Sequence, residues 1–137
     1  MARVSEHPIQ QARDLLAAAQ AEYERAQHER GGAAVIALRN SCGKGWLAAL
    51  EAACAFFLKQ GVAEEDLPDT DRGRRYFAGH YMDREIRKAF ESLRTTFHID
   101  GYYEGNLEFD HMPGYFDELK EFIDLADLAA PRAAPEA

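Results

Sequence analysis

The sequence predicts an all-α protein built as an up-down bundle of four principal helices, and three observations lead to this fold class. Apolar residues recur at helical spacing over four long stretches of the chain. Glycine, proline and acidic residues gather between those stretches, where loops are expected. No stretch of useful length alternates like a strand, and no internal repeat is present. Helices joined by short loops favour an up-down bundle.

Length and composition bound the architecture and exclude some partners. The chain has 137 residues, of which 47% are hydrophobic, so we expect one helical-bundle domain over residues 1–130 that folds alone. Residues 131–137 form a Pro/Ala tail that is predicted to be disordered. The net charge of −8 argues against non-specific binding of DNA, other nucleic acids or anionic membranes by the whole surface.

The sequence also predicts a cytoplasmic protein that does not enter a membrane. Its first residues lack the apolar core of a signal peptide, and no apolar run approaches the ~20 residues of a membrane span. Cys42 and Cys54 do not form a Cys-x-x-Cys arrangement. They are therefore predicted to be reduced, buried thiols rather than a disulfide or a metal site.

The first helix is predicted from about Pro8 to Gln27. Proline suits the first turn of a helix, where a missing N–H costs little, and Gly31-Gly32 is expected to end the element. The helical spacing is carried by a set of apolar residues: Ile9, Ala12, Leu15, Leu16, Ala19, Tyr23 and Ala26.

A second element begins near Ala33 and contains the central helix of the predicted bundle. Its segment Trp46–Leu58 is almost uniformly apolar, as expected for a buried helix, and should end before Gly61. Gly43 and Gly45 interrupt the pattern, and two glycines in one helical turn cost ~1 kcal/mol each relative to alanine. They indicate either a kink or a close approach of another helix that a side chain would block.

Residues 62–71 are acidic and contain a proline, which predicts a loop, and Asp69, Thr70 or Asp71 is expected to cap the helix that follows. Gly79 favours a bend in that helix and Asp83 favours a cap for a second segment, so one bent helix and two helices both remain open. Its predicted buried stripe consists of Tyr76, Phe77, Tyr81, Ile86, Ala89, Phe90, Leu93 and Phe97.

The last helix follows a turn that is predicted for residues 101–106. Asp110 is expected to cap this helix, with Pro113 in its first turn. The inward face is predicted to be Phe116, Leu119, Phe122, Ile123 and Ala126.

Charge is segregated between two parts of the chain. Residues 72–94 contain seven bases against three acids, whereas residues 104–127 contain eight acids and only Lys120. We interpret this as complementary packing of two helices or as ordinary solvated faces. The alternative is a basic strip that meets phosphates or an acidic partner.

Two apparent motifs do not meet the requirements of the sites that they suggest. Gly43-Lys44-Gly45 lacks the earlier glycine, the Ser or Thr after the lysine and the preceding strand of a phosphate-binding loop. Glu108-Phe-Asp-His111 has the Glu-x-x-His spacing of di-iron bundles, but those sites need a second such motif and two further glutamates. We therefore predict no metal site.

Arg94 and His98 are the candidate catalytic residues. They lie four positions apart, which places both side chains on one helix face, with ~5–6 Å between their Cβ atoms. A guanidinium there lowers the proton affinity of the imidazole and can hold a phosphate against it, which suits general acid–base cleavage of a phosphodiester. The interpretation that we prefer is a cation pair at a helix C-terminus, with the histidine bonded to the loop.

Four other residues are candidates for ligand binding: Tyr102, Tyr103, Arg75 and His80. The two tyrosines either anchor the loop on the end of the bundle or offer aromatic platforms to a nucleobase. Arg75 and His80 are five apart and point away from each other on a helix, whereas Tyr76 and His80 are four apart and should be neighbours. His80 is expected to be a half-buried packing residue.

The stretch Phe90–Gly105 contains Leu-Arg-x-x-Phe-His followed by Gly-Tyr-Tyr-Glu-Gly. Together with Glu22-Tyr23-Glu24 in the first helix and the glycine-bounded helix over residues 43–61, it resembles the signature region of a HEPN-like bacterial family of uncharacterised function. The resemblance covers most of residues 9–126. It implies a helical bundle, often a homodimer, and places the Arg and His of the family's ribonucleases on Arg94 and His98.

Two functional hypotheses follow from these observations. The one that we favour is a non-enzymatic, homodimeric HEPN-like module without a cofactor, whose Arg94/His98/Tyr103 end binds a partner protein or a small, nucleotide-like ligand, in a toxin–antitoxin or nucleotide-related system. The other is a metal-independent RNA endonuclease that uses Arg94 and His98. Four to six residues separate Arg from His in the family's ribonucleases, whereas three do here, which favours the first hypothesis. Arg75 and His80 have four intervening residues but lack the family's surroundings.

Overall fold

The computed structural model describes residues 7–131 and confirms the all-α class. Within that range no strand occurs, and the α-helices are α1 (Pro8–Gln27), α2 (Gly31–Lys59), α3 (Asp71–Tyr81), α4 (Arg84–Leu93) and α5 (Met112–Leu128). A π-helix, η2 (Arg94–Tyr103), continues α4, and two 3₁₀ turns, η1 (Glu64–Asp66) and η3 (Phe109–His111), lie in the connections. The tail that is predicted to be disordered lies outside the described residues, apart from Pro131.

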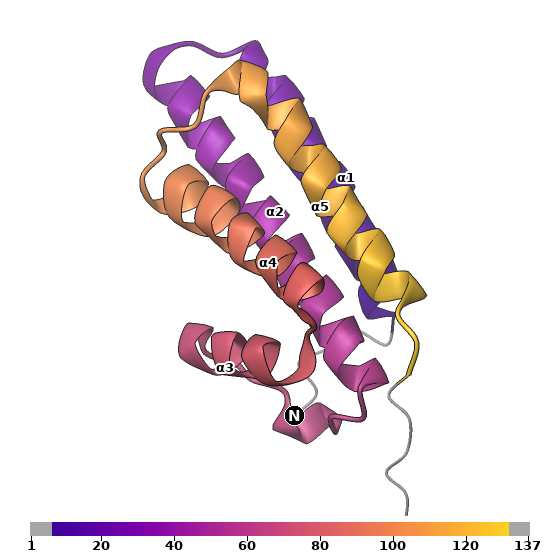
Figure 1. Ribbon diagram of the computed structural model, residues 1–137. Helices are drawn as coiled ribbons and strands as arrows, with labels where there is room; N and C mark the ends of the chain where they lie inside the picture. The colour runs from indigo at the N-terminus through magenta and orange to yellow at the C-terminus, as the bar shows by residue number, and fades with distance from the viewer. Residues whose placement is uncertain (1–6, 132–137) are drawn as a thin grey trace, which may run out of the picture.

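The helices α1, α2, α4 and α5 run alongside one another, and α3 lies across one end of them (Figure 1). α2 contacts α1, α5 and η2, and α5 contacts both α1 and α4. The helix that contains Trp46–Leu58 is therefore central, as its apolar sequence predicts. α3 packs more loosely, since Ala78 is the one residue in it that is fully buried.

Gly43 and Gly45 allow η2 to lie against the backbone of α2, which continues as one helix through both positions. A Cβ built on Gly45 would lie 2.7 Å from Cδ1 of Phe97, and one on Gly43 would lie 3.1 Å from Cδ1 of Tyr102. Real Cβ atoms do not approach a ring as closely as the first of these distances. Of the two alternatives that the sequence leaves open, close approach is therefore the one that explains this pair of glycines.

The sequence leaves open whether one bent helix or two helices follow the acidic loop. The structure has two helices there, α3 and α4. The carboxylate of Asp83 accepts a hydrogen bond from the Ile86 N–H at 3.0 Å and caps α4. The hydroxyl of Thr70 accepts one from the Gly73 N–H at 3.0 Å, so Thr70 is the cap of α3 among the three predicted candidates. Gly79 lies inside α3 and does not mark the break.

α4 widens into the π-helix η2 at Arg94. The N–H of Glu104 donates to the carbonyl of Ile99 at 2.9 Å, which is the i→i+5 pattern of a π-helix. The turn that is predicted for residues 101–106 therefore begins at residue 104, because residues 101–103 still belong to η2. η2 can pack against α2 at Gly101 because this residue has no side chain. A Cβ on it would lie 2.5 Å from Sγ of Cys42.

The predicted end of α1 at Gln27 is confirmed, but two residues that were expected to bound helices do not do so. α1 ends at Gln27, and Gly31, with φ of +58°, instead begins α2. Asp110 does not cap α5, because it lies inside the turn η3. The His111 N–H donates to the carbonyl of Glu108, the residue before this turn, and His111 occupies the N-cap position of α5. The prediction that Pro113 lies in the first turn of α5 is confirmed.

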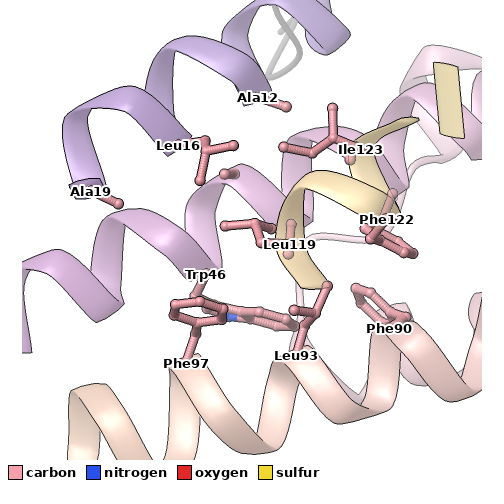
Figure 2. Packing of buried hydrophobic residues seen from close by; sticks show 14 of the residues in the cluster. Ala12, Leu16, Ala19, Trp46, Phe90, Leu93, Phe97, Leu119, Phe122 and Ile123 are labelled. Atoms are coloured by element: carbon pink, nitrogen blue, oxygen red, sulfur yellow. The ribbon is translucent and has the colours of Figure 1, made fainter. Parts of the chain in front are cut away.

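The core lies where α1, α2, α5 and the α4–η2 segment meet (Figure 2). Rings of different elements contact one another there: Trp46 and Phe90 have centroids 5.5 Å apart, and Phe90 and Phe122 have centroids 5.8 Å apart. Burying one such side chain stabilises the fold by roughly 1.5–3 kcal/mol. Every predicted inward residue of α5 is buried, as are Phe90, Leu93 and Phe97.

Two apolar side chains that the periodicity assigns to the interior are exposed instead. Tyr76 is 69% exposed, because α3 packs through Ala78 and the ring of Phe77 and leaves this side to solvent. Leu47 is 50% exposed on α2, on the face between α1 and η2. That face forms part of a groove between α2 and η2.

Candidate functional site

A groove of about 400 Å³ lies between α2 and η2 and is the candidate site. The first wall comes from α2 and the second from the π-helix, and the groove exists because the glycines of α2 bring these two elements together. The lining residues are Asn40, Gly43, Lys44, Trp46 and Leu47 of α2, with His98 and Tyr102 of η2. Aromatic and aliphatic walls with a few polar groups are typical of small-ligand sites.

His98 is half-buried in this groove and lies flat against Trp46. Their ring centroids are 5.3 Å apart with planes inclined by 20°, and the ring of Tyr103 meets the imidazole edge-on at 4.9 Å. Burial lowers the pKa of His98. The charge of Asp71 raises this pKa, and the charges of nearby arginines lower it further. The imidazole is therefore neutral at pH 7 and offers one N–H donor and one acceptor.

Arg94 is held by Asp71 rather than by the groove. Its Nε and Nη2 donate to the two carboxylate oxygens of Asp71 at 2.7 and 2.8 Å, a bidentate pair. This hydrogen-bonded pair lowers the pKa of Asp71 and raises that of Arg94. Both charges act on His98, but the pair mainly ties the first turn of α3 to the start of η2.

Tyr102 and Tyr103 lie at the other end of η2, and the first of them lines the groove. The Tyr102 ring covers Gly43, and the carbonyls of both tyrosines accept hydrogen bonds from the guanidinium of Arg39. Arg39 thereby satisfies carbonyls that the end of a helix would leave without partners. Both rings remain about half exposed, at 45% and 59%, so both are open to a ligand.

Arg75 and His80 are on α3 and do not line the groove. His80 is exposed rather than half-buried, since it lies on the outer side of α3. The prediction that it neighbours Tyr76 is confirmed, because their rings are parallel to within 5° at 6.2 Å. Within one copy of the chain, the six candidate residues thus lie in three places. His98 and Tyr102 line the groove, with Tyr103 next to them in η2; Arg94 is in the pair with Asp71; Arg75 and His80 are on α3.

The basic residues 72–94 do not pack against the acidic residues 104–127 through ion pairs in the part of the chain that the structure describes. Two of the acids pair instead with Arg13 of α1, and one of these two also pairs with Lys120. Of the seven bases, Arg94 has an ion-pair partner. The bases on α3 and α4 are thus mostly solvated, which was one of the two ordinary interpretations of the charge pattern.

The two cysteines do not add reactive groups to the site. Both thiols are free; Cys42 is buried and Cys54 is half-buried. Burial raises their pKa values to about 12 and about 11. Among residues 7–131, no group of three or more His, Cys, Asp or Glu side chains could hold a metal ion.

Sequence reasoning missed most of the groove. Asn40 and Lys44 lie in the stretch that looked like an interruption of the helix, and Trp46 and Leu47 were assigned to the interior. Asp71 was considered as a helix cap and not as a partner of Arg94. The two glycines were the one available signal, because they indicate close packing at the level of this stretch.

No protein-family model, no curated protein and no solved structure matches this chain. Within residues 7–131, none of the helices has both the length and the apolar character that crossing a membrane requires.

Proposed function

We propose that this chain is a non-enzymatic, cytoplasmic binding module of the HEPN-like type, with its helices in up-down order, and that its groove binds a nucleotide-like ligand. The observation that carries the proposal is the groove itself, in which Trp46, His98 and Tyr102 converge from two elements around about 400 Å³. The module acts as a homodimer in a toxin–antitoxin or nucleotide-related system, as the family resemblance implies.

The lining of the groove suits a nucleobase. Aromatic rings provide stacking surfaces that are worth roughly 1–3 kcal/mol per base. The neutral imidazole of His98 and the amide of Asn40 both offer a donor and an acceptor, as base edges require. Lys44 also lines the groove, and its ammonium would have to leave the Glu22 carboxylate, 3.2 Å away, to contact a phosphate.

The state of Arg94 favours binding over cleavage. A phosphodiester-cleaving site needs a cation that is free to contact the phosphate beside the histidine. Here Asp71 occupies the guanidinium through two hydrogen bonds, and Arg94 is not among the residues that line the groove. Using it in catalysis would first require that this ion pair be broken.

The fluorescence of Trp46 provides a direct test, because it is the one tryptophan of the chain and lies in the groove. Titration with AMP and UMP should change its emission in a saturable way. The substitution Tyr102→Ala should weaken binding by roughly tenfold, as expected for the loss of one stacking partner. The matched control is Tyr76→Ala on α3, which should bind as the wild type does.

Two results would contradict the proposal. One is the absence of any saturable response to nucleotides, nucleosides or free bases. The other is equal loss of binding in Tyr76→Ala and Tyr102→Ala, which would place the ligand elsewhere. Circular dichroism of each variant shows whether the fold is retained.

The second candidate function is the metal-independent ribonuclease, and the observation that favours it is the lowered pKa of His98. A histidine with a lowered pKa can accept a proton at neutral pH, as a general base must. An RNA-cleavage assay with a chelator present tests this function. If wild type cleaves RNA and His98→Ala does not, the result would support the ribonuclease. If wild type does not cleave RNA, the result would favour the binding module.

A further inference from the structure

The groove between α2 and η2 has little charge in its walls. Among its lining residues, only Lys44 has a charged side chain at pH 7, because the imidazole of His98 is neutral. A nucleotide differs from its nucleoside by a phosphate group with a charge of about −1.5 to −2 at this pH. Which of the two binds better therefore depends on whether a cation beside the groove is available to the phosphate.

Lys44 is engaged by Glu22 of α1. Its Nζ lies 3.2 Å from one carboxylate oxygen of Glu22, and Nη2 of Arg25 donates to the other oxygen at 3.1 Å. The hydrogen bond from Lys44 is the main cause of the lowered pKa of Glu22, so this carboxylate is ionised at pH 7. If Lys44 turned to a phosphate, Glu22 would lose a partner and its negative charge would lie beside the ligand.

Two arginines near the groove are engaged as well. Arg39 donates through Nε and Nη2 to the carbonyls of Tyr102 and Tyr103. Arg94, four residues before His98, donates to both carboxylate oxygens of Asp71. A phosphate that recruited either guanidinium would replace existing hydrogen bonds instead of adding new ones, and such an exchange gains little free energy.

Arg74 of α3 is the remaining cation whose charge reaches this site. Within residues 7–131 its guanidinium makes no hydrogen bond or ion pair, and its charge helps to lower the pKa of His98. Arg74 is not among the residues that line the groove. Its attraction for a bound phosphate therefore acts from outside the groove and is weakened by water and salt.

We propose that the groove selects uncharged planar ligands, nucleobases and nucleosides, over nucleotides, and that Glu22 sets this selectivity by keeping the ammonium of Lys44 in an ion pair. The inference rests on the proposed function and narrows its ligand class. Trp46 and Tyr102 offer stacking surfaces, and the amide of Asn40 and the imidazole of His98 offer neutral donors and acceptors. A phosphate adds charge to the ligand without adding a net contact.

Parallel titrations with adenine, adenosine and AMP test the ligand class, with the fluorescence of Trp46 as the signal. In wild type, AMP should bind no more tightly than adenosine at the same ionic strength. The comparison of adenine with adenosine shows whether the ribose contributes. An affinity for AMP that exceeds the affinity for adenosine tenfold or more would overturn the inference.

The substitution Glu22→Gln tests the role of the carboxylate, because glutamine keeps the size of the side chain and releases Lys44. The affinity for AMP should rise roughly tenfold relative to adenosine, as expected for one hydrogen bond between charged groups. The affinity for adenosine should stay unchanged, which also shows that the fold is retained. The matched control is Glu24→Gln, which removes the same charge from an exposed position of α1 and should keep the wild-type ratio.

Two further measurements show whether Lys44 supplies the gain. In Glu22→Gln, AMP binding should weaken as salt is added, because screening reduces the new charge contact, whereas AMP binding to wild type should change little. The double variant Glu22→Gln/Lys44→Gln should lose the gain. A gain that persists in the double variant, or an unchanged ratio in Glu22→Gln, would show that the Glu22–Lys44 pair does not set the selectivity.

The inference and the proposed function can fail in different ways. If adenine, adenosine and AMP all leave the emission of Trp46 unchanged, the groove does not bind nucleotide-like ligands and both proposals fail. If adenosine and AMP both bind but AMP binds tenfold more tightly, the proposed function stands and the assignment of an uncharged ligand fails.

Discussion

The imidazole of His98 and the indole of Trp46 are stacked, with ring centroids 5.3 Å apart and an angle of 20° between their planes. The contact links η2 to the central helix at the groove. It also shields one face of the imidazole from water, which is why burial is the main cause of the lowered pKa of His98. One residue pair therefore connects the packing of the fold to the chemistry of the site.

The first prediction concerns the pH dependence of stability. Because the folded pKa of His98 lies below its ordinary value of 6.5, the unfolded chain takes up a proton before the folded chain does. Stability should therefore fall as the pH decreases below about 6.5, until the folded pKa is passed. Thermal unfolding of His98→Phe, which keeps a flat ring against Trp46, should show a smaller decrease over this window.

The control for this prediction is His80→Phe, because His80 is exposed on α3 and has no such stack with the core. It should retain the wild-type decrease. An identical pH profile for wild type and His98→Phe would mean that His98 does not contribute to it. A proton NMR titration of the His98 ring would then show whether its pKa is lowered at all.

The helices could be predicted from the sequence because their signals are local. Phe90, Leu93 and Phe97 repeat at helical spacing and are buried, and Asp83 is the kind of residue that caps a helix. The positions of Tyr76 and Leu47 could not be predicted in this way. Periodicity shows that a residue belongs to an apolar stripe, whereas its burial depends on which elements cover that stripe.

The candidate site depended on relationships that are not local. His98 was identified from its spacing to Arg94, but its stacking partner lies on another helix. Arg94 and Asp71 are 23 residues apart, and no local spacing rule connects them. Sequence spacing could therefore identify single candidate residues. The groove itself could not be predicted, because it results from the packing of η2 on α2.

The second prediction concerns the ion pair between Arg94 and Asp71. Both side chains are partly exposed, at 23% and 37%, so the pair should contribute only about 1 kcal/mol even though it is bidentate. Asp71→Asn should lose that amount in urea unfolding. It should also accelerate hydrogen exchange in α3, because the pair fixes the first turn of this loosely packed helix.

The matched control removes an ion pair that lies within one helix and does not hold two elements together. Lys120→Gln breaks an exposed contact with Asp124, in which the lysine is 62% exposed, and should change the free energy of unfolding by less than about 0.5 kcal/mol. Unchanged exchange rates for the α3 amides in Asp71→Asn would show that other contacts hold this helix.

The third prediction concerns the two thiols. Burial raises the pKa of Cys42 to about 12 and that of Cys54 to about 11, so almost no thiolate is present at pH 8. Neither should react with a disulfide reagent within minutes in the folded protein, and both should react once urea unfolds it. The positive control is Leu128→Cys, at a position 82% exposed. Rapid reaction of the folded wild type would indicate local opening of α2.

The fourth prediction concerns the contact between Gly45 and Phe97. A methyl group at position 45 would lie 2.7 Å from Cδ1 of a ring that is 0% exposed. Over-packing of this kind costs ~1–3 kcal/mol, while alanine recovers ~1 kcal/mol of helix propensity. Gly45→Ala should therefore lower the free energy of unfolding by on the order of 1 kcal/mol, as measured by urea denaturation.

Gly79→Ala separates the steric effect from the propensity effect. Gly79 also lies inside a helix, but a Cβ on it meets nothing within 4 Å. The substitution should therefore stabilise the protein by up to ~1 kcal/mol. Combining Gly45→Ala with Phe97→Leu should cost less than the sum of the two single substitutions, because the smaller side chain makes room for the new methyl group. Strict additivity would mean that the ring does not limit position 45.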